Sequence, residues 1–173
     1  MSSIRSLAAI TLRRLGQIDG ELHALHELVK GLSDEPNGQV VDVAIEAREL
    51  VGSLSVDYPG AVAVIARTRA PAHVGGTALH RILGNLLRNA MRAAGNEGRV
   101  LVTVVSDAGD IVILVEDDGP GMGALPVLNG VGLRSVRRLV HQAGGRLETI
   151  PRGRLGGASI RVHLPAADRE MAS

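Results

Sequence analysis

One amphipathic helix is the strongest structural signal in this chain. In the stretch His80–Ala94, apolar side chains recur three and four residues apart, which is the spacing of a helix with one buried face. Asn85 and Asn89 lie four residues apart, so their amides project from one side of that helix. The chain must therefore fold around a helix that buries one face and carries two stacked amides. The apolar positions are Ile82, Leu83, Leu86, Leu87, Ala90 and Met91.

Strand and turn signals flank this helix. Val62–Ala66 is a buried-strand run, and Val100–Val105 and Ile111–Glu116 are apolar runs joined by a short polar segment with glycine, a hairpin pattern. Arg146–Ile150 and Ala158–Leu164 predict a second hairpin around a glycine-rich loop.

Two more helices complete the expected domain. Val40–Leu54 and Gly130–Ala143 have helical apolar spacing, whereas Ala70–Gly76 reads as a Pro/Gly connection. Three helices and about five strands predict an α+β fold: a two-layer α/β sandwich, with a mixed, mostly antiparallel sheet and helices on one face.

A separate helix is expected ahead of this domain. Ser3–Leu32 keeps a continuous heptad whose a and d positions are apolar except at Thr11. Because this apolar stripe is narrow, it favours pairing with another helix, and we expect homodimerisation. The alternative is that the helix packs against its own domain. The expected division is residues 1–35 for this helix, 40–166 for the domain and 167–173 for a frayed tail.

Composition excludes several classes of protein. The 173 residues contain no Cys, Phe or Trp and one Tyr, and the formal net charge is +1. Disulfides and thiol chemistry are excluded, and the scarcity of aromatic rings and of net positive charge argues against nucleic-acid binding. No apolar run approaches the ~20 residues of a membrane span. We expect a cytoplasmic location.

Two glycine-containing motifs accompany the amide-bearing helix. In Glu116–Met122, EDDGPGM, a strand ends in carboxylates and is followed by glycines that let the backbone approach a ligand closely. In Asn129–Val136, NGVGLRSV, a glycine-rich turn runs into a helix whose free N–H groups suit phosphate. Amide oxygens such as those of Asn85 and Asn89 suit Mg²⁺.

The order and spacing of these three segments resemble the N, G1 and G2 boxes of the GHKL superfamily. That superfamily includes histidine-kinase catalytic domains, type II topoisomerases, MutL and the heat-shock chaperone ATPase. The N-L-L-x-N-A sequence at Asn85–Ala90 is most similar to sensor histidine kinases. The resemblance runs from about Val40 to Pro165 and implies the GHKL sandwich fold, its strand order, and ATP and Mg²⁺ as cofactors.

The resemblance also implies roles on the helix. Asn89 matches the Mg²⁺ ligand, and Arg92 lies where a Lys often faces the phosphates; the alternative for Arg92 is a solvated charge. Asn85 stands where hydrolytic members carry a catalytic Glu. Because an amide cannot act as a general base, we expect poor ATP hydrolysis and transfer of the γ-phosphoryl group to another protein group.

Further roles follow for the two glycine motifs. Asp117 matches the residue that accepts a hydrogen bond from the adenine amino group, and Gly119 and Gly121 would admit the purine. Two departures from the family stand out: the segment Gly123–Asn129 is shorter than the usual ATP lid, and Ala158 replaces the usual Thr. The G2 turn and the start of its helix are matched by Gly130, Gly132 and Leu133.

The phosphoryl acceptor is the remaining question. His26 lies in a His-Glu-Leu sequence of the kind that carries the acceptor, but the usual Arg and Pro do not follow. We therefore expect the acceptor His on a missing dimerisation helix or a partner protein, with His26 as an alternative. The predicted function is the catalytic domain of a sensor or split histidine kinase in two-component signalling, with a response regulator as partner. The alternatives are an anti-sigma-factor-type serine kinase and a degenerate nucleotide-binding scaffold.

Overall fold

The computed structural model describes residues 39–66, 69–121 and 131–167. The predictions for Ser3–Leu32 and His26, for Gly130, and for the tail from residue 168 lie outside the described residues. No helix in the described part of the chain is long and apolar enough to cross a membrane.

Five strands form the main sheet, in the order β2-β4-β5-β7-β6. Only β2 and β4 pair in parallel; the other neighbours are antiparallel. The predicted mixed, mostly antiparallel sheet is therefore confirmed. The strands are β2 (Ala61–Ala66), β4 (Arg99–Asp107), β5 (Asp110–Asp117), β6 (Arg146–Ile150) and β7 (Ser159–Pro165).

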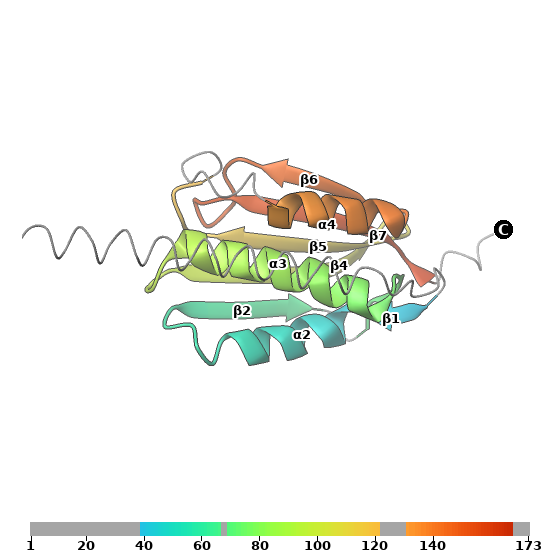
Figure 1. Ribbon diagram of the computed structural model, residues 1–173, viewed down its shortest axis with the longest axis horizontal. Coiled ribbons are helices and arrows are strands. Elements are labelled where there is room, and N and C mark those ends of the chain that lie inside the picture. Colours follow the sequence, from blue (N-terminus) through green and yellow to red (C-terminus); the bar gives the residue numbers. More distant parts are fainter. Residues whose placement is uncertain (1–38, 67–68, 122–130, 168–173) are drawn as a thin grey trace, which may run out of the picture. The chain divides into compact units, whose positions relative to one another are not determined.

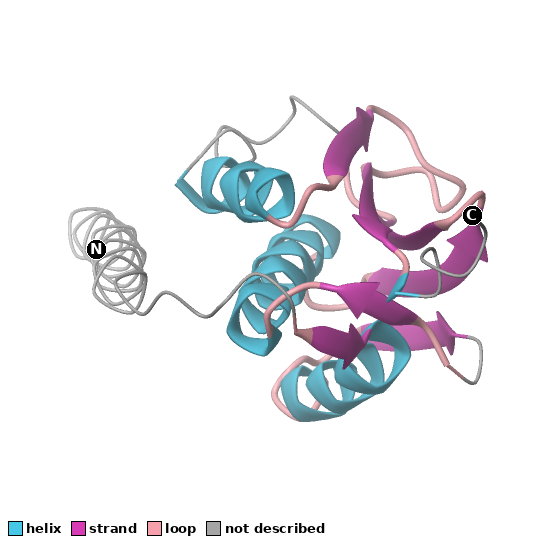
Figure 2. Cartoon of the chain, turned by 90° about the vertical axis from the view of Figure 1, so that its right-hand side faces the viewer, coloured by secondary structure: helices cyan, strands magenta, loops and turns pink. Residues whose placement is uncertain are grey.

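Three helices cover one face of this sheet (Figures 1 and 2). They are α2 (Val43–Leu54), α3 (Gly76–Ala94) and α4 (Val131–Gln142). The helix α3 crosses the middle of the layer, with its apolar face fully buried, and packs against both α2 and α4. The two-layer α/β sandwich is confirmed, with the predicted amphipathic helix at its centre.

A second, two-stranded sheet corrects two predictions. Residues Val40–Asp42 form the strand β1, not the first turn of a helix, and Pro71–His73 form β3 inside the predicted connection; the two strands pair antiparallel. Asp42 explains the first error because its side-chain Oδ1 caps α2, accepting from the Ala44 N–H at 3.0 Å. The same oxygen accepts from the Ala70 N–H at 3.1 Å, which joins both strands to the helix start.

The end of α3 is held by the only aromatic residue of the chain. The helix ends at Gly95, where φ is +76°, a conformation that glycine adopts without strain. The Tyr58 hydroxyl donates to the Gly95 carbonyl at 2.7 Å and lies 3.3 Å from the Gly98 carbonyl. Tyr58 therefore ties the segment after α2 to the C-terminal end of α3.

Alternation along β5 decides which side each of its last two residues faces. Ile111, Ile113 and Val115 are buried in the core beneath the helices. Because side chains alternate between the faces of a strand, Asp117 lies on this helix-covered side and Glu116 lies on the opposite side. The two neighbouring carboxylates therefore face different surroundings.

Candidate functional site

Asp117 is a buried carboxylate at the end of β5. Its residue is 4% exposed, and its Oδ1 accepts from the backbone N–H groups of Gly119 at 2.9 Å and Ala158 at 3.2 Å. Burial raises the pKa of Asp117 above its ordinary value, although the two N–H donors oppose that rise. Within the described residues both hydrogen bonds fall on Oδ1, which leaves Oδ2 as the acceptor for a ligand.

Backbone surrounds this carboxylate closely. The Asp117 N–H donates to the Ala158 carbonyl at 3.1 Å, and the Gly157 N–H donates to the Asp117 carbonyl at 3.0 Å. A Cβ added at Gly157 would collide with the Asp117 carboxylate, and one at Gly119 would collide with the Ala93 carbonyl. Gly157 and Gly119 are therefore required here because only glycine lets the chain approach so closely.

Asp118 has a structural partner instead. Its Oδ1 accepts from the Arg99 N–H at 2.7 Å, and its Oδ2 accepts from the Arg99 Nε at 3.0 Å. The backbone N–H of Arg99 is the main cause that lowers the pKa of Asp118. This carboxylate joins the end of β5 to the start of β4, so the two adjacent aspartates have different roles.

The start of α4 lies against the amides of α3. A Cβ added at Gly132 would lie 3.7 Å from the Asn89 Nδ2 and 3.9 Å from the Asn85 Oδ1. Neither amide makes a hydrogen bond within the described ranges, and both residues are half-buried. Leu133 follows Gly132 and is buried in the core, so it anchors the first turn of α4. The sequence motifs of Asn85, Asn89 and Gly132 are thus brought together.

The C-terminal half of α3 connects the two groups. Ala93 lies one turn after Asn89, and its carbonyl faces Gly119, two residues after Asp117. Arg92 is exposed in this last turn, and no partner for it is found in the described part of the chain. Gly121 has φ of +86°, and a Cβ there would lie 3.1 Å from the Pro151 carbonyl. The C-terminal half of α3 therefore lies against Gly119 and Gly132, whereas the close neighbour of Gly121 is Pro151 and not α3.

Sequence reasoning singled out Ala158 in the β6–β7 connection only as a departure from the usual Thr, and missed the backbone donors of this connection. Gly157 and Ala158 support Asp117 through backbone N–H groups, and a backbone donor leaves no mark in residue type. The available sequence signal for such support was the adjacent pair Glu116-Asp117. Adjacent residues of a strand face opposite sides, so each carboxylate needs partners of its own. No group of three His, Asp or Glu side chains among the described residues could hold a metal ion.

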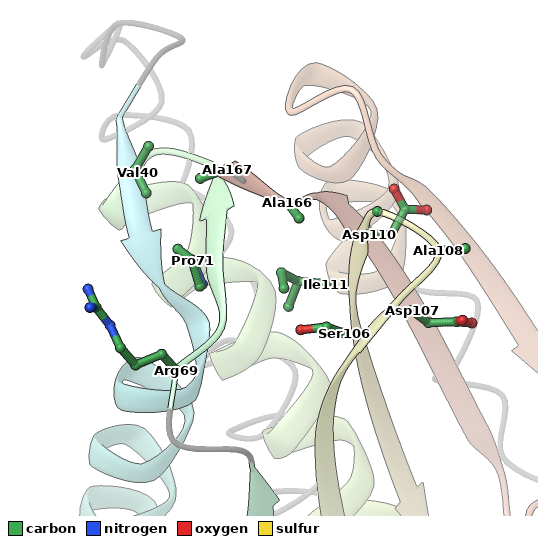
Figure 3. A pocket seen from close by; sticks show the side chains of 11 residues that line it. Val40, Arg69, Pro71, Ser106, Asp107, Ala108, Asp110, Ile111, Ala166 and Ala167 are labelled. Carbon is green, nitrogen blue, oxygen red and sulfur yellow. The ribbon is translucent and has the colours of Figure 1, made fainter. Parts of the chain in front are cut away.

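A separate cavity lies at the other end of β5. It has a volume of about 690 Å³ and opens between the two-stranded sheet and the turn from β4 to β5 (Figure 3). Asp110 begins β5 beside this cavity and Asp117 ends the strand, so the cavity is not part of the candidate site. Its lining includes Val40, Arg69, Pro71, Ser106, Asp110 and Ile111.

Comparison with known families and proteins gives a consistent result. The model of the family described as histidine kinase-, DNA gyrase B- and HSP90-like ATPase matches residues 75–168. Sensor protein CitS of Bacillus subtilis is 33% identical over 110 residues, which are 55% of this chain and 20% of that protein. Sensor histidine kinase GtrS of Pseudomonas aeruginosa is 26% identical over 168 residues, 88% of this chain and 34% of that protein.

Solved structures share the fold. The mycobacterial sensor histidine kinase MprB superimposes with a TM-score of 0.65 at 23% identity, covering 75% of this chain and 97% of that one. The catalytic domain of histidine kinase ThkA gives a TM-score of 0.65 at 18% identity, covering 73% and 95%. The chain spans only a fifth to a third of the length of the two sensor proteins above.

Proposed function

The chain belongs to the histidine kinase-, DNA gyrase B- and HSP90-like ATPase family, with a catalytic domain of the histidine-kinase type, and we propose that it binds Mg·ATP and transfers the γ-phosphoryl group to a histidine. The observation that carries the proposal is the gathering of three motifs around α3: Ala93 faces Gly119 beside Asp117, and Asn85 and Asn89 face Gly132.

Asp117 is the proposed adenine-recognising residue. Its buried carboxylate has one oxygen already occupied by two N–H groups, and the other suits the exocyclic amino group of adenine. Guanine presents a carbonyl oxygen at the corresponding position, which a buried carboxylate repels. Leaving such a carboxylate without a donor costs about 1–3 kcal/mol or more, so one hydrogen bond gives base selectivity.

Asn85, Asn89 and Arg92 are the proposed phosphate-side residues. The half-buried amides have no partner within the described chain, so their oxygens are available to a cation held jointly by phosphates and water. We assign Asn89 as the Mg²⁺ ligand and Arg92 as a charge near the phosphates. Gly132, with Leu133 behind it, is assigned the role of letting the start of α4 approach the two amides. Gly119 and Gly121 line the base side, and Gly130, which lies outside the described residues, is assigned to the phosphates by its resemblance to the G2 motif.

The reaction proposed is transfer, not hydrolysis. Bound ATP supplies the phosphoryl group; the bond from its γ-phosphorus to the β,γ-bridging oxygen breaks as a bond to the acceptor nitrogen forms. In such transfers the protein mainly positions groups and neutralises charge. Asn85 fits this role because its amide cannot take a proton from water.

The partners are also proposals. We expect the acceptor histidine on a dimerisation helix or a partner protein, with His26 as the candidate within this chain, and a response regulator as the next recipient. Homodimerisation through Ser3–Leu32 and a cytoplasmic location belong to the same proposal.

Calorimetric titration of the full chain tests the site. ATP and GTP are titrated with and without Mg²⁺ into wild type, Asn89→Ala and Asp117→Ala, with Glu148→Gln on β6 as a control outside the site. We expect wild type and the control to prefer ATP, Asp117→Ala to lose that preference, and Asn89→Ala to lose the Mg²⁺ dependence. Equal affinities in all proteins would overturn the site assignment, and a wild type that binds no nucleotide would leave only a scaffold.

A further inference from the structure

The connection between β6 and β7 forms a tight turn against the end of β5. The Gly153 N–H donates to the Gly157 carbonyl at 2.7 Å, and the Gly156 N–H donates to the Gly153 carbonyl at 3.1 Å. The last residues of this turn supply the Gly157 and Ala158 N–H groups that hold Asp117. The position of the turn therefore determines two of the N–H donors that Asp117 receives, while the third comes from Gly119.

Glu116 holds this turn from the opposite side of β5. It is 1% exposed, and its Oε1 accepts from the Arg154 backbone N–H at 3.0 Å. Its Oε2 accepts from the Arg154 Nη2 at 2.8 Å and from its Nε at 3.2 Å. Burial acts to raise the pKa of Glu116, but the hydrogen bonds and charge of Arg154 outweigh it, so the pKa lies below its ordinary value.

The turn has no room to move closer to the strand. A Cβ added at Gly153 would lie 2.8 Å from the Ser159 Cβ and 3.1 Å from the Glu116 Oε1. The Ser159 hydroxyl is buried here without a hydrogen-bond partner within the described chain. The backbone at Gly153 is thus seated directly on Glu116 and Ser159.

These contacts connect two neighbouring carboxylates through one loop. Glu116 binds the middle of the turn at Arg154, and Asp117 binds its end at Gly157 and Ala158. A buried carboxylate is costly unless it is paired, and breaking one partner of such a pair displaces the groups around it. Any displacement of Arg154 therefore reaches the donors of Asp117 within four residues.

We propose that Glu116 and Arg154 are positioning residues, whose ion pair joins a buried carboxylate to a largely exposed guanidinium and holds residues 153–158 in the conformation that aims Asp117 at adenine, and so sets the preference for adenine over guanine. The inference rests on the proposed function because it takes Asp117 as the residue that reads the base. Neither residue touches the nucleotide in this scheme; both act through the turn.

The test compares this ion pair with a second pair on the same face of the sheet. Glu116→Gln, Arg154→Ala and the double variant are made in the full chain, beside Glu148→Gln and Arg146→Ala, whose side chains pair at 3.6 Å on β6. The readout is the ratio of ATP to GTP affinity, measured by calorimetry. Partial unfolding lowers both affinities equally, so this ratio does not respond to stability alone.

We expect the ratio to fall by about tenfold in each single variant of the Glu116–Arg154 pair, the value of a hydrogen bond to a charged group. The double variant should lose no more than either single one, since residues that act as a unit are not additive. The two control variants should keep the wild-type ratio. Gly153→Ala, which changes no charge, should reproduce the fall by displacing the turn.

Two results would decide against the inference or against its premise. An unchanged ratio in folded Glu116→Gln and Arg154→Ala would show that the pair only stabilises the fold. If Glu116→Gln does not fold, Arg154→Ala decides alone, since it removes a side chain that is 69% exposed. A wild type that does not prefer ATP would overturn the proposed function instead, which is a distinct outcome.

Discussion

The two ends of the candidate site are built differently. Around Asp117 the backbone is crowded: Gly119 and Ala158 donate to one carboxylate oxygen, and Gly157 has no room for a side chain. Around Asn85 and Asn89 the amides have no partner in the described chain, and Gly132 has room for a methyl group. In the proposed site, the end that would bind the base is preorganised by the fold, whereas the end that would bind the phosphates leaves its amides for the proposed ligand and cation. Preorganisation of one end reduces the ordering cost of binding.

Gly157→Ala should have the largest effect. The added methyl group would collide with the Asp117 carboxylate, so either the turn or Asp117 must move. We expect ATP affinity to fall by about a hundredfold, the upper range for a disrupted buried hydrogen-bonding group. The free energy of unfolding should fall by about 1–3 kcal/mol, as for an overpacked core. Calorimetry and urea unfolding measure the two quantities.

Gly132→Ala is the matched variant at the other end. Its methyl group would meet Asn89 and Asn85 at 3.7 and 3.9 Å, which is ordinary van der Waals contact. We expect the free energy of unfolding to stay within about 0.5 kcal/mol of wild type. If Gly132→Ala destabilises the protein as much as Gly157→Ala, the two ends are equally crowded and the comparison fails.

Asn89→Ala should have the second largest effect, and only when the cation is present. We expect Mg·ATP affinity to fall by about tenfold, while the affinity for adenosine stays unchanged. Titration of ATP and adenosine with and without Mg²⁺ separates the two ends of the site. An equal loss for adenosine would mean that Asn89 supports the base end instead.

Arg92→Ala should have a smaller effect because the side chain is exposed. We expect about a threefold loss of ATP affinity at low salt, which disappears as salt is raised. Arg146→Ala on β6 removes the same charge outside the candidate site and serves as the control. A loss that persists at high salt would contradict a purely electrostatic role for Arg92.

The finest test is the pH dependence of base recognition. Burial raises the pKa of Asp117 in the folded protein, so its carboxylate becomes protonated at a higher pH than an ordinary aspartate. The ATP-to-GTP affinity ratio should therefore fall as the pH is lowered through that raised pKa. The free energy of unfolding of the nucleotide-free protein depends on pH in the opposite sense. Asp117 favours folding on the acid side of the window, because the folded state binds its proton more tightly than the unfolded state does.

Asp118→Asn sharpens this test. The Asp118 charge is a lesser contribution to the raised pKa of Asp117, so its removal should move the midpoint of the ratio slightly to lower pH. A midpoint at or below that of a free aspartate would show that the base end is more open to water than the structure indicates.

Periodicity predicted the parts of the fold that have enough residues to show it. The helix α3, the β4–β5 hairpin and α4 were found because each repeats its apolar pattern over several turns or pairs. The strands β1 and β3 were missed because three residues carry too little pattern, and Val40 fits the apolar face of a helix over Val40–Leu54 equally well.

The candidate site shows the same limit. Asn85, Asn89 and Asp117 were found from side-chain types in a recognisable order, and their roles remain proposals. Ala158 was noted only for lacking the usual Thr side chain, and the support that it and Gly157 give Asp117 was missed because their donors are backbone N–H groups. A role performed by the backbone becomes visible only when the strands are placed in register.

The single tyrosine makes this protein its own optical probe. Tyr58 bonds to the carbonyls just beyond α3, and the pKa of its phenol is raised by burial first and then by the charges of Asp118 and Asp117. With no tryptophan to mask it, its fluorescence reports on one known place, next to the proposed base end. Occupation of the site can therefore be followed without a label.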